Sequence, residues 1–192
     1  MIAEQLVRYG EIVAQRGPGW IMLASGRPFW PLNPDPADIT IDDIATGLAH
    51  QNRFGGHAGT YTVAQHSWLV SFAVPYELAL WGLLHDASEG LGLLDLPRPV
   101  KHHPSMASYR EAEKRLMAAV CERFCLPTRE PDGGQGRGPS HAPHRAAGSD
   151  AASDPGEGRT DVEPYPFHIE PWGPNRAKRE FLARFAAITG RE

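Results

Sequence analysis

The most chemically suggestive stretch of the chain is the doublet His85-Asp86, followed three residues later by Glu89. An imidazole nitrogen beside a carboxylate oxygen is a mixed ligand set that suits Mg²⁺-like and first-row divalent cations. The preceding residues 77–84 are too apolar on all sides for a surface helix and predict a buried one. An Asp buried at its end needs a cation or a hydrogen-bond partner. We therefore expect a metal site there, with Glu89 on the same helical face.

Simpler interpretations exist for each of these residues. A His-Asp pair can cap a helix end, or can be a core pair whose polar atoms are satisfied by hydrogen bonds. Arg53 can be a solvated or ion-paired surface residue. Its place after a predicted buried helix and before Gly55-Gly56 leaves open a second role, because a guanidinium offers a forked donor to phosphate.

The elements that must position these residues are mostly predicted helices. Short apolar bursts from Trp20 to Trp30 indicate a small hairpin or an irregular segment, and the prolines of residues 31–36 exclude a helix there. Apolar residues recur at helical spacing in five further segments, which are residues 2–16, a helix with Thr40 as its N-cap, and residues 68–74, 105–124 and 175–188.

The length and composition of the chain limit which classes of protein and which partners are plausible. The chain has 192 residues, 41% of them hydrophobic and 22% charged, which predicts one globular domain over residues 1–192. A formal net charge of −4 without a basic stripe argues against duplex nucleic acid as a partner. No apolar run approaches 18 residues and no secretory leader begins the chain, so we expect no membrane partner and a cytoplasmic location. Cys121 and Cys125 are expected to be reduced core residues.

Several motifs together resemble the HD-domain metal-dependent phosphohydrolases, in particular compact bacterial and phage members similar to 5'-deoxynucleotidases. The resemblance covers roughly residues 28–125 and the tail, and its most specific parts are residues 61–67, 85–89 and 95–101. It implies an all-α fold, an HD-domain helical bundle preceded by the small hairpin or irregular segment. The residues that match the family pattern are Arg53, His66, His85, Asp86, Glu89 and Asp95.

The resemblance also implies roles for these residues. His66, His85 and Asp86 would bind one divalent metal ion, which could be Mn, Co, Mg, Zn or Fe. Glu89 and Asp95 would be the acid/base or water-orienting catalytic residues. By the same resemblance, Arg53 would bind the substrate phosphate.

The chain departs from the family in two places. Six residues separate Glu89 from Asp95 where the family usually has five, and the Asp expected as a fourth ligand on a helix after Phe124 is missing. Residues 128–160 instead form a low-complexity segment, rich in Gly, Pro and Ser, that composition predicts to be disordered. Translating residues 134–151 one base later permits Val-Lys-Ala-Ala-Asp-Arg-Arg-Met-Leu-Leu-Thr-Glu-Arg-Arg-Asp-Leu-Met, an amphipathic helix with the missing Asp. We interpret this as a compensated frameshift.

The resulting hypothesis is a phosphohydrolase whose small-molecule substrate is a nucleotide, namely a deoxynucleoside 5'-monophosphate that it cleaves to deoxynucleoside and phosphate. One alternative is a deoxynucleoside triphosphate triphosphohydrolase. Another is an impaired metal- or nucleotide-binding scaffold that lacks the fourth ligand. The sequence is also compatible with a homodimer.

The reading frame of residues 128–160 gives a first prediction. The alternative frame should supply an Asp and an apolar helix face together, whereas each Gly or interior Pro of the present frame opposes a helix by about 1 or 3 kcal/mol relative to Ala. We expect the frame-restored protein to retain Mn²⁺ better, to melt at a higher temperature and to hydrolyse deoxynucleoside monophosphates faster. Equal metal retention, melting temperature and activity in the two proteins would show that Asp132, Asp150 or Asp154 serves as the fourth ligand, or that no fourth protein ligand is needed.

Overall fold

The computed structural model describes residues 2–127 and 169–190, so the predicted disorder of residues 128–160 lies outside the described residues. The described chain is almost entirely helical, with one two-stranded antiparallel sheet in which Ile21 pairs with Phe29. The α-helices are α1 (Ile2–Arg16), α2 (Ile41–His50), α3 (Val63–Ala73), α4 (Ala79–Leu84), α5 (Arg98–Lys101), α6 (Ala107–Phe124) and α7 (Pro174–Thr189). The strands are β1 (Ile21–Met22) and β2 (Pro28–Phe29), and the 3-10 turns are η1 (Pro36–Asp38), η2 (Arg53–Gly56), η3 (Tyr76–Leu78), η4 (Glu89–Leu91) and η5 (Pro104–Met106).

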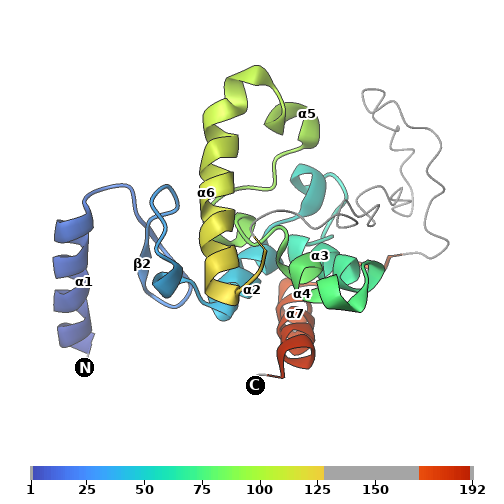
Figure 1. The fold of residues 1–192 in the computed structure, drawn as a ribbon, viewed down its shortest axis with the longest axis horizontal. Coiled ribbons are helices and arrows are strands. Elements are labelled where there is room, and N and C mark those ends of the chain that lie inside the picture. Colours follow the sequence, from blue (N-terminus) through green and yellow to red (C-terminus); the bar gives the residue numbers. More distant parts are fainter. Residues whose placement is uncertain (1, 128–168, 191–192) are drawn as a thin grey trace.

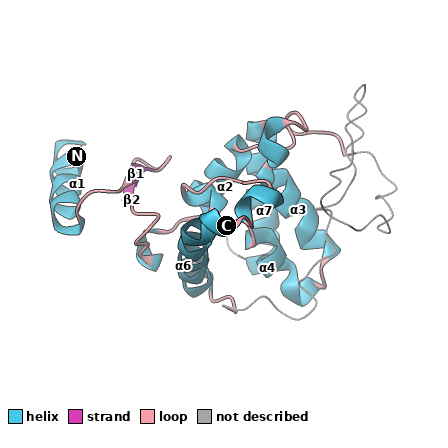
Figure 2. Ribbon diagram, turned by 90° about the horizontal axis from the view of Figure 1, so that it is seen from above, coloured by secondary structure: helices cyan, strands magenta, loops and turns pink. Residues whose placement is uncertain are grey.

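This architecture confirms the all-α prediction and the small N-terminal hairpin. Helix α7 packs against α2, α3 and α4, and α3 packs along α4, so the end of the described chain closes the bundle (Figure 1). Helix α1 lies apart from these helices in both views (Figures 1 and 2). No described helix is long and apolar enough to cross a membrane.

Helices α2 and α3 each begin after a threonine whose side chain caps the helix. Thr40 caps α2 by accepting a hydrogen bond from the backbone N–H of Asp43, as the sequence predicts. Thr62 caps α3 in the same way through the N–H of Gln65. The expected start of this helix at residue 68 was therefore wrong by five residues, and His66 lies in the first turns of α3 rather than before it. Because of this cap, the His66 side chain is presented from a rigid helix.

The buried core joins segments that are far apart in sequence. Phe181 and Phe185 of α7 belong to the same apolar cluster as Leu48 of α2 and Leu84 of α4. The buried Gln65 side chain fixes the segment before α7, because its Nε2 donates to the carbonyl of residue 170 at 2.8 Å and its Oε1 accepts from the N–H of residue 172 at 2.9 Å. The element that carries His66 is thus held to the closing helix.

Two glycines let α2 approach the turn that follows the His-Asp doublet. Gly47 of α2 faces Gly90 of η4 so closely that a Cβ on Gly47 would meet the Gly90 carbonyl inside van der Waals distance. A Cβ on Gly90 would lie 2.6 Å from the carbonyl oxygen of Ile44 and 3.0 Å from Leu48 Cγ. Neither neighbour can move away easily, because Ile44 and Leu48 are both fully buried in the core. This backbone contact fixes the position of Glu89, the residue before Gly90.

We predict that Gly90→Ala destabilises the protein, because the added methyl group must displace the α2 backbone. Overpacking of this kind costs about 1–3 kcal/mol, to be measured as a lower urea midpoint. The matched control is Gly10→Ala in α1, where a Cβ meets nothing within 4 Å. An unchanged midpoint for Gly90→Ala would contradict the described packing of α2 against η4.

Candidate metal centre

Three predicted ligands converge on one point. His66 from α3 and His85 and Asp86 from the end of α4 each offer a ligand atom, and these atoms all lie within 4.8 Å of one another. Asp86 Oδ2 is 3.1 Å from His85 Nε2 and 3.6 Å from His66 Nε2. The two imidazole rings stand edge to face with centroids 5.2 Å apart. Two imidazole nitrogens and a carboxylate oxygen make a donor set that fits a divalent transition metal.

The local structure orients each imidazole. His85 Nδ1 lies 2.8 Å from the carbonyl oxygen of Gly82, a hydrogen bond that places the proton on Nδ1 and leaves Nε2 as the ligand atom. His66 Nδ1 lies 3.5 Å from the hydroxyl of Tyr61, which is itself buried. Burial raises the pKa of the Tyr61 hydroxyl above its ordinary value, so this group stays protonated.

The charges at the cluster are coupled. Burial lowers the pKa of His85, but the charge of Asp86 and the hydrogen bond to it outweigh burial and hold this pKa above its ordinary value. Burial raises the pKa of Asp86, and the neighbouring His85, His66 and Arg53 more than reverse the effect, so Asp86 is ionised. In the absence of a metal ion, a proton on His85 compensates the negative charge of Asp86. A metal ion must displace that proton to bind.

Arg53 lies beside the cluster at the start of η2. Its Nη1 is 3.5 Å from Asp86 Oδ2 and 3.4 Å from Asp95 Oδ1. The turn that presents it contains three residues with positive φ, which are Phe54 at 57°, Gly55 at 60° and Gly56 at 85°. A positive φ is unusual for Phe54, the one residue of the three with a side chain. Such strain persists only where the surroundings enforce it. The arrangement places one guanidinium between two of the predicted site carboxylates.

Glu89 and Asp95 both lie next to this cluster. Glu89 is 1% exposed, and burial, followed by the charges of Asp86 and Asp95, raises its pKa to about 9. Burial also raises the pKa of Asp95, and Arg53 opposes this increase. The predicted helical placement of Glu89 was partly wrong, because α4 ends at Leu84 and the chain continues in tighter turns. The bond from the Glu89 N–H to the Asp86 carbonyl, 3.0 Å long, keeps Glu89 close to the doublet.

Three buried polar atoms at the cluster have no hydrogen-bond partner among the described residues. They are Nε of Arg53, Oε2 of Glu89 and Oδ2 of Asp95. A buried donor or acceptor without a partner costs free energy, and such atoms persist at sites that bind a ligand. One free donor and two free carboxyl oxygens beside the candidate ligand set could bind a ligand that offers both a hydrogen-bond acceptor and a donor or a cation.

Two further residues of the site escaped the sequence analysis. The Gln51 side chain donates to the Glu89 carbonyl and, at 3.3 Å, to that of Leu93, and it accepts from the Asp95 N–H at 3.1 Å. Lys101 Nζ lies 3.5 Å from Glu89 Oε1. No sequence signal marks Gln51, because all of its partners are backbone atoms. Lys101 is the last residue of the motif at residues 95–101, but the family resemblance implies no role for it.

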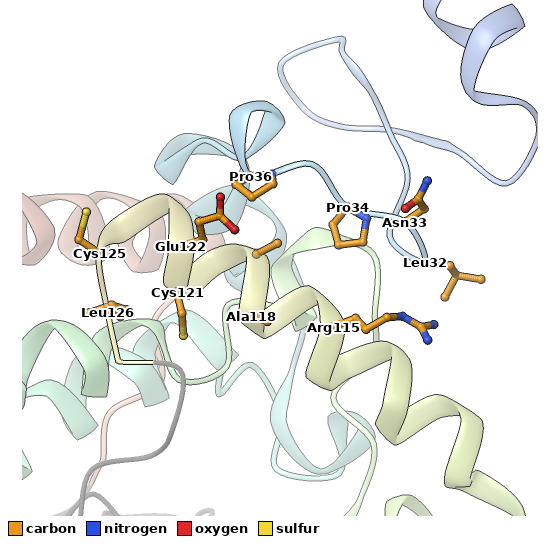
Figure 3. A pocket seen from close by; sticks show the side chains of 11 residues that line it. Leu32, Asn33, Pro34, Pro36, Arg115, Ala118, Cys121, Glu122, Cys125 and Leu126 are labelled. Atoms are coloured by element: carbon orange, nitrogen blue, oxygen red, sulfur yellow. The ribbon is translucent and has the colours of Figure 1, made fainter.

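A separate cavity of about 630 Å³ lies between the chain before α2 and one face of α6 (Figure 3). None of its lining residues belongs to the cluster around Asp86. The cavity is lined by Leu32, Asn33, Pro34, Pro36, Arg115, Ala118, Ala119, Cys121, Glu122, Cys125 and Leu126. Its walls contain both cysteines, of which Cys121 is buried, as expected, and Cys125 is exposed, contrary to the sequence prediction.

Comparison with known proteins identifies relatives whose names state no activity. No family model matches the chain. It is 38% identical over 109 residues to the uncharacterized protein YfdR of Escherichia coli, covering 56% of this chain and 60% of that protein. It is 42% identical over 118 residues to the uncharacterized protein RCAP_rcc00048 of Rhodobacter capsulatus, covering 56% of this chain and 59% of that protein. The chain thus spans about three fifths of the length of these relatives, and the function has to be argued from the site.

The protonation of His85 gives a prediction for metal binding. Below the raised pKa of His85 the metal-free protein carries a proton there, and a metal ion needs the neutral imidazole. Mn²⁺ affinity should therefore increase with pH through this range, with release of a proton at the lower pH values. Calorimetry in two buffers of different ionisation enthalpy measures that proton.

His85→Asn is expected to lose most of the affinity for Mn²⁺ together with the proton release, and exposed His102→Asn should behave like the wild type. Binding of Mn²⁺ that is equally tight in His85→Asn would exclude the cluster as the metal site.

Proposed function

We propose that the chain is a metal-dependent phosphohydrolase of the HD type that cleaves deoxynucleoside 5'-monophosphates to deoxynucleoside and phosphate. The observation that carries the proposal is the convergence of the ligand set His66, His85 and Asp86 with an arginine and two further carboxyl groups. A phosphomonoester requires charge compensation at its oxygens, a nucleophilic water and a proton for the leaving group. This cluster contains a group for each requirement.

The metal ion would be held by His66, His85 and Asp86. When bound, a divalent cation supplies a Lewis acid for the phosphoryl oxygens and lowers the pKa of a coordinated water. The choice among Mn, Co, Mg, Zn and Fe belongs to the proposal and rests on the mixed nitrogen and oxygen donors.

The chain's own residues account for the remaining steps. Arg53 has a free Nε and an Nη1 shared by two carboxylates, and its fork can turn to two oxygens of a phosphate. Asp95 orients the attacking water through its free Oδ2. With a pKa of about 9, Glu89 holds a proton at neutral pH and donates it to the leaving 5'-oxygen as the phosphorus–oxygen bond breaks. The water adds its oxygen to phosphorus and gives a proton to the Asp95 carboxylate, and Glu89 regains the proton it donated from solvent as Asp95 releases its own.

The first experiment is incubation of the full chain with Mn²⁺ or Co²⁺ and each deoxynucleoside monophosphate, followed by chromatography of the products. Release of deoxynucleoside and inorganic phosphate supports the proposal. Release of tripolyphosphate from deoxynucleoside triphosphates would favour the triphosphohydrolase instead. Retention of Mn²⁺ without cleavage of any substrate would contradict the proposal and leave the metal-binding scaffold.

Substitution of the two further carboxyl groups gives a prediction for turnover. Glu89→Gln and Asp95→Asn should each lower kcat by about 10²–10⁴-fold, the range for losing general acid or base assistance. Both variants should still bind Mn²⁺, because neither residue belongs to the ligand set. Exposed Glu111→Gln is the control and should keep full activity. Unchanged turnover in either site variant, with metal bound, would show that its assigned role is wrong.

A further inference from the structure

We propose that Lys101 is a positioning residue for Glu89, holding one carboxyl oxygen so that the other faces the substrate. This inference rests on the proposed hydrolase function and goes beyond it by assigning a role to a side chain outside the metal ligands. Lys101 Nζ lies 3.5 Å from Glu89 Oε1, whereas Glu89 Oε2 has no partner among the described residues. The two oxygens of one carboxyl group are therefore in different environments.

Two side chains of α6, one helical turn apart, fix Lys101. Arg110 Nη1 donates to the Lys101 carbonyl at 2.7 Å, and Glu113 pairs with the Lys101 ammonium. Residues three apart lie on the same face of a helix, so this face of α6 holds both the backbone and the tip of Lys101. Pro97 directly precedes the short helix α5, which ends at Lys101, and the Lys101 N–H donates to the Pro97 carbonyl at 3.0 Å. Glu113 thus holds the ammonium, and the two backbone bonds fix the main chain from which the Lys101 side chain extends.

Backbone contacts alone do not orient the Glu89 carboxyl group. The bond from Gln51 to the Glu89 carbonyl and the packing of Gly90 on α2 fix the main chain. The carboxyl group lies beyond three rotatable bonds, and its side chain is 2% exposed. Among the described residues, Lys101 is the cation within ion-pair distance of it. Removal of Lys101 would free the rotation of the Glu89 side chain while leaving its backbone in place.

Lys101 remains charged in this environment. Burial lowers its pKa, but the hydrogen bond and the charge of Glu113, followed by Glu89 and Asp86, raise the pKa above its ordinary value. Its side chain is 20% exposed, as is that of Glu113. If Lys101 served only to join α5 to α6, its ion pair with Glu113 would be sufficient. The further contact with buried Glu89 distinguishes a positioning role from a purely structural one.

The test combines kinetics with a double-mutant cycle. Lys101→Met should lower kcat by about 10–100-fold, as is usual for partners that orient site residues, while KM and Mn²⁺ affinity stay unchanged. Lys101→Arg, which keeps the cation, should restore part of kcat. Exposed Lys114→Met on α6 is the matched control and should match the wild type. In a Glu89→Gln background, Lys101→Met should cause no further loss, because the group it positions has already been removed.

Other outcomes would overturn the inference. Additive losses in the double variant would show that Lys101 acts independently of Glu89, and a raised KM with unchanged kcat would make it a substrate-binding residue. Crystal structures of Mn²⁺-loaded wild type and Lys101→Met provide a readout that does not depend on activity. The Glu89 carboxyl group should change rotamer in the variant, and an unchanged rotamer would contradict the inference. An inactive wild type in which the variant still moves Glu89 would contradict the proposed hydrolase alone.

Discussion

The site depends on how the charges of three neighbouring carboxyl groups are compensated, of which Glu89 is buried and Asp86 and Asp95 are partly buried. Asp86, Glu89 and Asp95 lie close enough to shift one another's pKa, and two cations, Arg53 and Lys101, face them. Like charges in a low-dielectric region cannot all be ionised without further compensation. The protein therefore keeps Asp86 ionised beside its histidines and keeps a proton on Glu89. Under the proposed function, this division would leave Asp86 able to bind the metal ion and Glu89 able to donate a proton within a single cluster.

Close contacts to the main chain hold the segments that carry these carboxyl groups together. Gly47 and Gly90 allow α2 to touch the turn after the doublet, and Gln51, just after α2, binds main-chain atoms on both sides of the same loop. Side chains of ordinary size would hold the two segments apart by several ångströms. Two carboxyl groups six residues apart, Glu89 and Asp95, can consequently face the same cluster.

Part of the site could be predicted from the sequence, because it depends on local motifs. His85 and Asp86 directly follow one predicted helix and His66 lies just before another, and the structure brings the three ligand atoms within 4.8 Å of one another, as the resemblance implied. The start of α3 was missed although Thr62 and Gln65 have the Ser/Thr-x-x-Glu/Gln spacing of a capping box, a signal that could have corrected it. Gln51 could not have been found, since its bonds to backbone carbonyls leave no trace in residue type. Lys101 and Glu113 are twelve residues apart on different helices, and only the fold brings them together.

One divalent cation is proposed to bind between His66, His85 and Asp86. Anomalous diffraction from a crystal soaked in Mn²⁺ tests it most directly, because the signal locates the metal independently of any assumed ligand. The account predicts a single strong peak within coordination distance of Nε2 of both histidines and of Asp86 Oδ2. A peak elsewhere, or none at a Mn²⁺ concentration that supports turnover, would contradict it.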